Sequence, residues 1–367
     1  MKTIHHKYTE SLPGGSSPQI RAHLMDITCV ALLFIFMPVL FQSCRKELCY
    51  NHWEHAASVK ADIDAGYERK WETDNASAWE RNWDSELFNC EYEDLRPGIP
   101  GGLRIVVYRG GGYEERNIEA EGGLVRLYEG EHSLLFYNND TEYLVFDNLG
   151  SSATAMATTR TRTRFSLNDA DSKTPTRGYN SPDMLYGYYV DSYFGEKKLE
   201  ADAMPLEMHP LVYTYLIVAG FGHGLEYVVK ARGEIQGMAT GVYLNSGTTS
   251  DESGIILFDT DACEVTAHGV VASVRSFGIP GYPYDGYTTK AEDRRYSITL
   301  EVELRNGATK VFEPVDVTPQ LQAHPRGGVI EVDGFAVSDE EGTAGGGGFQ
   351  VDVDGWGEYE DIPLPLG

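Results

Sequence analysis

The stretch Leu103-Arg-Ile-Val-Val-Tyr108 sets the structural class of this chain of 367 residues. Its β-branched and aromatic residues predict a strand. Residues 97–102, with their prolines and glycines, predict the turn that leads into it, and Gly110-Gly-Gly112 predicts the turn that follows. Residues 117–119 and 124–128 then predict further strands. Turns at such short intervals indicate a protein built from sequential β-strands.

The same pattern continues in both directions from this strand. Upstream, Val59, Ala61 and Ile63 alternate with polar residues, as in a half-buried strand. Between the two strands, residues 67–92 are rich in charge and tryptophan, and residues 75–88 predict a short helix. Strands are also expected at 131–138, 143–146, 211–219, 226–231, 255–259, 264–277, 295–304, 315–321, 329–332 and 349–353. Short strands at about ten-residue spacing predict a mainly β fold of sandwich type.

An uncharged apolar run of fifteen residues, Ile27 to Phe41, ends at Gln42-Ser43-Cys44. This length suits the h-region of a signal peptide and is short for a bilayer span. Ser43 fits cleavage by a lipoprotein signal peptidase, which would leave lipid on the Cys44 sulfur, although Phe41 stands where Leu is usual. We therefore expect a bacterial envelope lipoprotein tethered to the membrane through Cys44. The alternatives are an internal apolar segment and a secretory signal without lipid.

The chain is strongly acidic, with 30 Lys and Arg against 56 Asp and Glu and a net charge of −26. Residues 1–43 carry three of the basic and two of the acidic residues, so the expected mature chain has a net charge of −27. Such a surface repels nucleic acid and anionic lipid. We therefore expect no nucleic-acid partner.

The length of the mature chain favours two domains. Residues 173–182 contain two prolines, a glycine and several hydroxyl side chains, which are typical of a linker. The expected organisation is a signal peptide at 1–43, an N-terminal β-sandwich at 44–172, a linker at 173–204 and a C-terminal β-sandwich at 205–367.

The remaining cysteines allow two interpretations. Cys49 and Cys90 are a candidate disulfide pair in an oxidising envelope. Alternatively, both stay reduced together with Cys263, which would behave as a small buried apolar residue. The sequence has no Cys-x-x-Cys pair, so cysteine does not support a zinc or redox site.

The stretch Thr158-Thr-Arg-Thr-Arg-Thr-Arg164 places Arg160, Arg162 and Arg164 on one face of an extended segment. One interpretation is a protease maturation site or a basic stripe for an anionic partner. The favoured alternative is an edge strand whose charged side chains discourage unwanted strand pairing.

Candidate chemistry is sparse. The expected mature sequence has no Gly-x-Ser-x-Gly nucleophile elbow, and His52 and His55 have no third metal ligand nearby. We therefore expect no catalytic residues, no metal and no cofactor. The turn with Tyr282, Tyr284 and Tyr287 could stack on a sugar or on a partner protein, or it could simply close the end of a sandwich.

Several stretches resemble an uncharacterised family of lipoproteins from Bacteroidales. They are the lipobox with Cys44-Arg-Lys-Glu-Leu-Cys-Tyr50, Tyr137-Asn-Asn-Asp-Thr141, Ser181-Pro-Asp-Met-Leu-Tyr-Gly187, residues 226–238, Phe277-Gly-Ile-Pro280, residues 312–319 and residues 345–356. That family is similar to the fimbrial anchor and tip subunits of the same bacteria. The resemblance implies two tandem transthyretin-like (fimbrillin-type) β-sandwich domains, an outer-membrane, cell-surface location and a pilin-like protein partner. It supplies no catalytic residues.

These observations favour a non-catalytic anchor or accessory subunit of a fimbria-like surface assembly, which would hold its partner by strand addition. Pro363 and Pro365 lack the amide donors that an inserted C-terminal strand needs, so a subunit at the end of an assembly is expected. The alternative is a surface lipoprotein that binds glycans.

We predict that the mature protein begins at Cys44 and carries acyl chains on it. Mass spectrometry of the N-terminal peptide should show the added lipid mass, and globomycin should cause the unprocessed precursor to accumulate. A Cys44→Ala variant is the control. An unmodified Cys44 in the mature protein would contradict the prediction.

Overall fold

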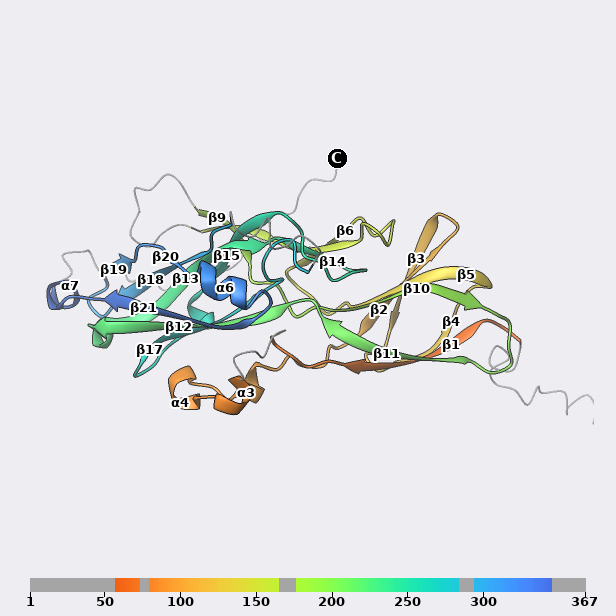
Figure 1. The fold of residues 1–367 in the computed structure, drawn as a ribbon, viewed down its shortest axis with the longest axis horizontal. Helices are drawn as coiled ribbons and strands as arrows, with labels where there is room; N and C mark the ends of the chain where they lie inside the picture. Colours follow the sequence, from red (N-terminus) through yellow and green to blue (C-terminus); the bar gives the residue numbers. More distant parts are fainter. Residues whose placement is uncertain (1–56, 73–78, 165–175, 284–293, 345–367) are drawn as a thin grey trace, which may run out of the picture. The chain divides into compact units, whose positions relative to one another are not determined.

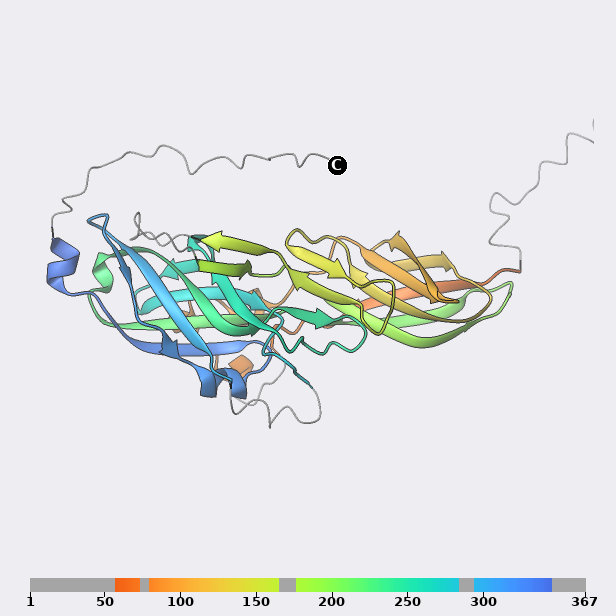
Figure 2. The ribbon, with the colours of Figure 1, turned by 90° about the horizontal axis from the view of Figure 1, so that it is seen from above.

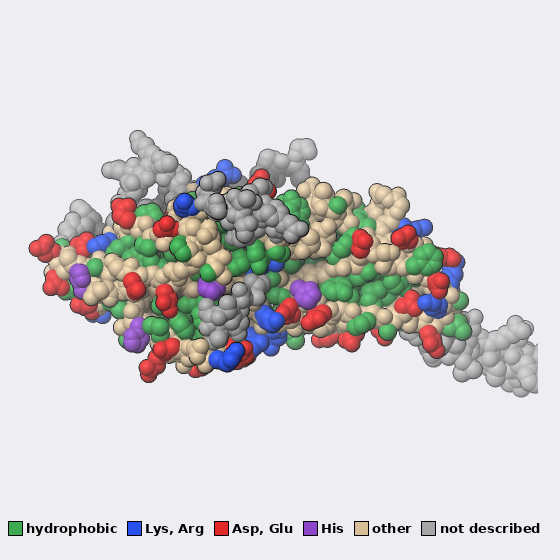
Figure 3. All heavy atoms as spheres, viewed as in Figure 1, with side chains coloured by type: hydrophobic (Ala, Val, Ile, Leu, Met, Phe, Trp, Pro, Cys, Tyr) green, Lys and Arg blue, Asp and Glu red, His purple; other side chains and the backbone are tan. Residues whose placement is uncertain are grey.

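Residues 57–72, 79–164, 176–283 and 294–344 are described by the computed structural model (Figure 1). Cys44, Cys49, Tyr284, Tyr287 and the strand expected at 349–353 lie outside these ranges. The described chain is mainly β, as predicted, and its residues from Ser58 onward belong to one compact unit. Acidic side chains are spread over the face shown in Figure 3.

The first sheet has seven strands in the order β3-β2-β5-β10-β11-β1-β4. Their bounds are β1 Lys60–Tyr67, β2 Leu103–Arg109, β3 Gly112–Ile118, β4 Gly122–Arg126, β5 Gly130–Asn138, β10 Tyr186–Gly195 and β11 Asp202–Pro210. Strands β10 and β11 pair only at Tyr186 and Gly187. Beyond that point the two halves of the sheet separate, and buried side chains such as Ile63 of β1 and Phe136 of β5 share one core between them.

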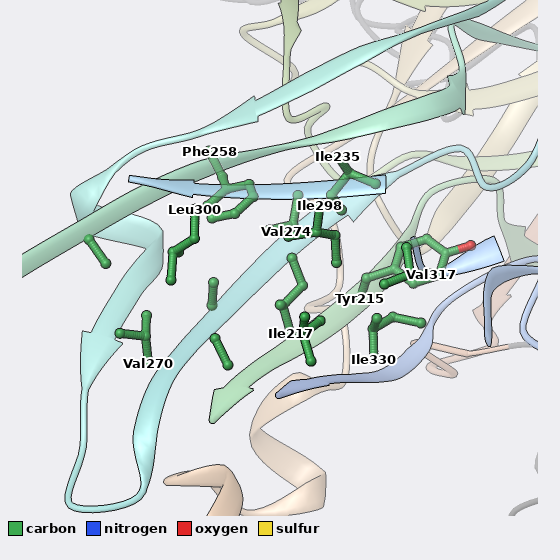
Figure 4. Packing of buried hydrophobic residues seen from close by; sticks show 14 of the residues in the cluster. Tyr215, Ile217, Ile235, Phe258, Val270, Val274, Ile298, Leu300, Val317 and Ile330 are labelled. Atoms are coloured by element: carbon green, nitrogen blue, oxygen red, sulfur yellow. The ribbon is translucent and has the colours of Figure 1, made fainter. Parts of the chain in front are cut away.

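Two further sheets face each other over a second core. One has the order β16-β17-β12-β21, and the other has the order β19-β18-β13-β15-β9-β8, with β20 paired to β18. Figure 4 shows Tyr215 and Ile217 of β12 packed toward Ile298 and Leu300 of β18. The bounds are β8 Thr161–Arg164, β9 Thr176–Asn180, β12 Tyr213–His223, β13 Val228–Ala239, β15 Ser253–Phe258, β16 Cys263–Val265, β17 Gly269–Ser276, β18 Ser297–Leu304, β19 Thr309–Val311, β20 Val315–Asp316 and β21 Gly328–Ala336.

A small three-stranded sheet covers the outer face of β2 and β5. It contains β6 (Leu144–Asp147), β7 (Met156–Thr159) and β14 (Gly241–Tyr243) in the order β14-β7-β6. Ala157 of β7 lies opposite Val242 of β14, and both are buried with Val106 and Leu135. Because β7 and β14 are far apart in sequence, this sheet joins the two halves of the chain.

The segment expected to be a linker, 173–204, is structured where it is described. Tyr179 of β9 pairs with Ile256 of β15, and Tyr188 of β10 pairs with Phe136 of β5. Gly178, one of the residues that suggested a linker, lies within β9, and the tyrosines of β10 give that strand enough apolar surface to pack. Residues 176–204 thus contain β9, β10 and the start of β11, and the predicted domain boundaries stay a prediction.

Tryptophans from the N-terminal half cover the outer face of the sheet that contains β12 and β17. Trp71 is only 1% exposed; its ring centroid lies 6.1 Å from that of Trp79 and 5.9 Å from that of Trp83. Beneath them lie Leu216 and Val271, among other apolar residues. The helix expected at 75–88 is present as two short helices, α3 (Trp79–Asn82) and α4 (Ser85–Phe88), followed by the 3-10 helix η1 (Tyr92–Leu95).

The close approach of Trp71 requires glycine in the facing chain. A Cβ on Gly327 would lie 2.4 Å from the Trp71 carbonyl oxygen, and the φ of Gly327 is +75°. The Trp71 carbonyl also accepts a hydrogen bond of 3.0 Å from the amide of Thr214, near the start of β12. Backbone and side chain of Trp71 are thus both fixed to the sheet.

The remaining helices are short. They are α6 (Thr318–Ala323), α7 (Asp339–Thr343) and the 3-10 helices η2 (Leu225–Tyr227) and η3 (Thr260–Ala262). The strand expected at 315–321 is wrong beyond Asp316, because Pro319 occupies the first turn of α6, where proline favours a helix. None of the helices in the described ranges is long and apolar enough to cross a membrane.

Helix α6 places Gln320 against the free edge of β21. The Gln320 side-chain amide donates to the Glu331 carbonyl at 2.7 Å, and its oxygen accepts from the Glu331 amide at 2.9 Å. The side chain thus makes both hydrogen bonds that a neighbouring strand would make at Glu331.

We predict that Trp71→Ala lowers the free energy of unfolding by about 3–5 kcal/mol, the usual effect of removing a buried aromatic side chain. Urea denaturation would measure this change. Val311→Ala, at a side chain that is 46% exposed, is the control and should change stability by less than about 0.5 kcal/mol. Equal effects of the two substitutions would contradict the packing described for Trp71.

Candidate partner-binding groove

A groove of about 620 Å³ lies beside β17, at the margin of the sheet opposite β21. Segments that are distant in sequence line it, among them the end of α4, the chain after β9, the turn between β15 and β16, and β17 itself. Its lining includes Phe88, Cys90, Ser181, Asp259 and Arg275.

The groove exists because β16 is short. Residues 264–277 were expected to form one strand, but the chain reverses at Gly269, whose carbonyl accepts a 2.8 Å hydrogen bond from the Thr266 amide. Strand β16 begins at Cys263, opposite Ala272, and on the side of β17 away from β12 no strand of the described chain pairs with the residues that follow Ala272. A glycine within an apparent strand was the sequence signal for this reversal.

The backbone of Ser273 faces the groove. The Arg275 amide donates to the Ser181 hydroxyl at 2.9 Å, and that hydroxyl donates to the Arg275 carbonyl at 3.1 Å. The Arg275 backbone therefore points away from β12. Because backbone polar groups alternate sides along a strand, those of Ser273 point in the same direction as those of Arg275. Ser273 thus offers its amide donor to an extended chain in the groove.

Charged side chains flank this position. Arg275 is exposed and forms no ion pair with the described part of the chain. Arg162, in contrast, is ion-paired with Asp259. The Asp183 carboxylate accepts hydrogen bonds from the backbone amides of Glu142 at 2.7 Å and Tyr143 at 2.5 Å. Arg275 is therefore the cation that remains available to an incoming carboxylate.

Cys90 lies half-buried in the wall of the groove. Burial raises the pKa of its thiol above the ordinary value, and the carboxylates of Asp94, Glu91 and Glu264 raise it further. The thiol is therefore protonated and a poor nucleophile at neutral pH. It is a free thiol in the structure, and Cys49 lies outside the described residues, so their pairing stays a prediction.

Of the predicted tyrosine loop, only Tyr282 and Pro283 lie within the described residues. The Tyr282 backbone is fixed by Thr249, whose amide donates to the Tyr282 carbonyl at 2.8 Å and whose hydroxyl accepts from the Tyr282 amide at 2.8 Å. The Arg326 guanidinium lies 5.3 Å from the centre of the Tyr282 ring. These contacts favour a structural role for Tyr282, while binding by Tyr284 and Tyr287 stays a prediction.

The arginine stripe forms an edge strand, as the favoured interpretation expected. Strand β8 pairs with β9 and ends its sheet. The side-chain arrangement differs from the expectation, because Arg162 is half-buried against Asp259 whereas Thr161 and Thr163 are exposed. Within the ranges that the structure describes, no cluster of three His, Cys, Asp or Glu side chains could hold a metal ion.

Comparison with known proteins supports this description of the fold. Residues 93–259 match the family described as a domain of unknown function, DUF5119. A protein of Bacteroides ovatus described as a fimbrium anchoring subunit, Fim4B, is 23% identical over 304 residues, which cover 75% of this chain and 88% of the relative.

Among solved structures, a protein of Bacteroides ovatus described as an adhesin is 18% identical and has a TM-score of 0.53; the match covers 77% of this chain and 94% of the other. This chain therefore has the fold of that adhesin. The predicted resemblance to the fimbrial anchor subunits of these bacteria is also confirmed, by the match to the anchoring subunit Fim4B.

We predict that iodoacetamide modifies Cys90 more slowly in the folded protein than after unfolding, at about pH 8, because the raised pKa reduces its thiolate fraction. Peptide mass spectrometry would measure the rate. Equal rates before and after unfolding would contradict the packing around Cys90. If Cys90 reacts only after reduction, the predicted Cys49–Cys90 disulfide is present instead.

Proposed function

We propose that this chain is a non-catalytic, lipid-tethered subunit that anchors or terminates a fimbria-like assembly at the cell surface. The observation that carries the proposal is the similarity to a fimbrium anchoring subunit over 88% of that relative's length. The expected acyl chains on Cys44 would hold the chain in the outer membrane, and its folded part would bind the neighbouring subunit.

The groove beside β17 is the proposed binding site for that neighbour. An extended segment of the partner subunit would lie along β17 and pair with the backbone of Ser273, which no described strand covers on the side away from β12. It could then displace the Ser181 hydroxyl from the Arg275 backbone and extend the ladder by two more hydrogen bonds. A single hydroxyl is a weak competitor, because a neutral hydrogen bond contributes only about 0.5–1.5 kcal/mol net.

Charge gives this contact its specificity. The whole chain carries a net charge of −26, so two such surfaces repel each other at long range. The exposed guanidinium of Arg275 offers a local exception beside the open backbone position. An acidic side chain in the partner's inserted segment would pair with it, and a charge-assisted hydrogen bond is stronger than a neutral one.

We predict that Ser273→Pro reduces capture of the pilin-like partner, because proline removes the amide donor that faces the groove. Ser273→Ala is the matched control, since it keeps that amide and should capture the partner as well as the unchanged chain does. The measurement is co-purification from outer membranes, with the captured subunit identified by mass spectrometry.

Proline is tolerated where the amide faces away from the sheet, so Ser273→Pro should still fold. Its thermal unfolding should be compared with that of Ser273→Ala. Equal capture by two folded variants would exclude this groove as the binding site. Absence of any fimbrial protein in the capture by the unchanged chain would refute the proposed function itself.

A further inference from the structure

We propose that the turn between β10 and β11 rests on the lipid surface through Phe194 and Leu199. This inference rests on the lipid tether of the proposed function. The two side chains are 62% and 69% exposed, although both are large and apolar. Phe194 lies near the end of β10, and Leu199 lies in the turn itself.

The turn is fixed beside the first described strand. Ser58 and Lys198 exchange two backbone hydrogen bonds of 3.2 Å, and the buried Lys60 ammonium donates to the Leu199 carbonyl at 2.8 Å. In both ribbon views this turn lies next to the start of β1 (Figures 1 and 2). The backbone is thus held in place while the side chains of Phe194 and Leu199 face outward, so little ordering is needed for binding.

The position of the turn along the chain argues for lipid as the occupant. Ser58 follows Cys44 by fourteen residues. Even fully extended, that length spans at most about 50 Å. The acyl chains on Cys44 therefore keep the turn near the bilayer, whereas a protein partner would have to diffuse to it.

The charges of the turn are consistent with this contact. Glu196, Lys197, Lys198 and Glu200 cancel, in a chain whose net charge is −26. Lys197 pairs with Glu129 at 2.6 Å and Lys198 pairs with Asp202 at 2.8 Å. The turn therefore offers no basic excess to anionic headgroups, and the contact is hydrophobic and insensitive to salt.

The test uses the lipidated full protein in phosphatidylcholine vesicles, with and without brominated acyl chains. In a Phe194→Trp variant, the added indole should lose roughly half of its emission to the bromines, because interfacial side chains lie about 5–10 Å deep. Val311→Trp is the matched control: Val311 is also exposed, at 46%, but lies on β19 of another sheet, so its indole should not be quenched.

Equal quenching of the two indoles would overturn the proposal. Sedimentation of the detergent-solubilised protein tests whether a protein covers the turn instead. The variant combines Phe194→Ser with Leu199→Ser. If it turns a dimer, or a complex with a co-purified partner, into a monomer, then a protein covers the turn and the proposal is wrong. The mass of Cys44 is measured on the same samples. An unmodified Cys44 would refute the tether, whereas lipidated Cys44 without added quenching would refute only the contact of the turn.

Discussion

The burial of Trp71 against β12 is the interaction on which the rest of the structure depends. The outer face of this sheet is apolar, with Leu216, Val218 and Val271 among its side chains. Without the segment that carries Trp71, Trp79 and Trp83, this face would be exposed to water. That segment comes from the N-terminal half of the chain, so its packing fixes the distant halves to each other. It also supplies Phe88 and Cys90 to the groove beside β17.

Local sequence pattern predicted the strands well. Residues 103–108 and 211–219 correspond to β2 and β12, because β-branched runs between turns leave few alternatives. It did not predict which strands pair. Strands β8 and β9 precede β10 in sequence but join the sheet of β13 and β15, an arrangement set by long-range packing. The strands β9 and β10 within the expected linker were missed for this reason, since composition alone does not show that a proline-containing segment contributes to two sheets.

The groove could not be predicted from the sequence, for a related reason. Its open position at Ser273 arises because β16 begins at Cys263, one residue too late to cover it, and no motif marks such a start. The cation beside it, Arg275, looks like any other exposed residue of a strand in the sequence. By contrast, the motifs that did stand out, the tyrosine loop at Tyr282 and the arginine stripe at Arg162, are engaged in contacts within the described chain.

The Gln320 side chain hinders the addition of a strand at the β21 edge of this sheet. At the β21 margin an arriving chain would first have to expel an amide that already makes both backbone hydrogen bonds of Glu331. Beside β16, where β17 is uncovered, the described contact that it would displace is the Ser181 hydroxyl on the Arg275 backbone. Within the described chain, this sheet is thus already hydrogen-bonded at Glu331 on its β21 edge, whereas the backbone of Ser273 is uncovered beside β16. Under the proposed function, a subunit that adds a strand along one edge would end a fibre.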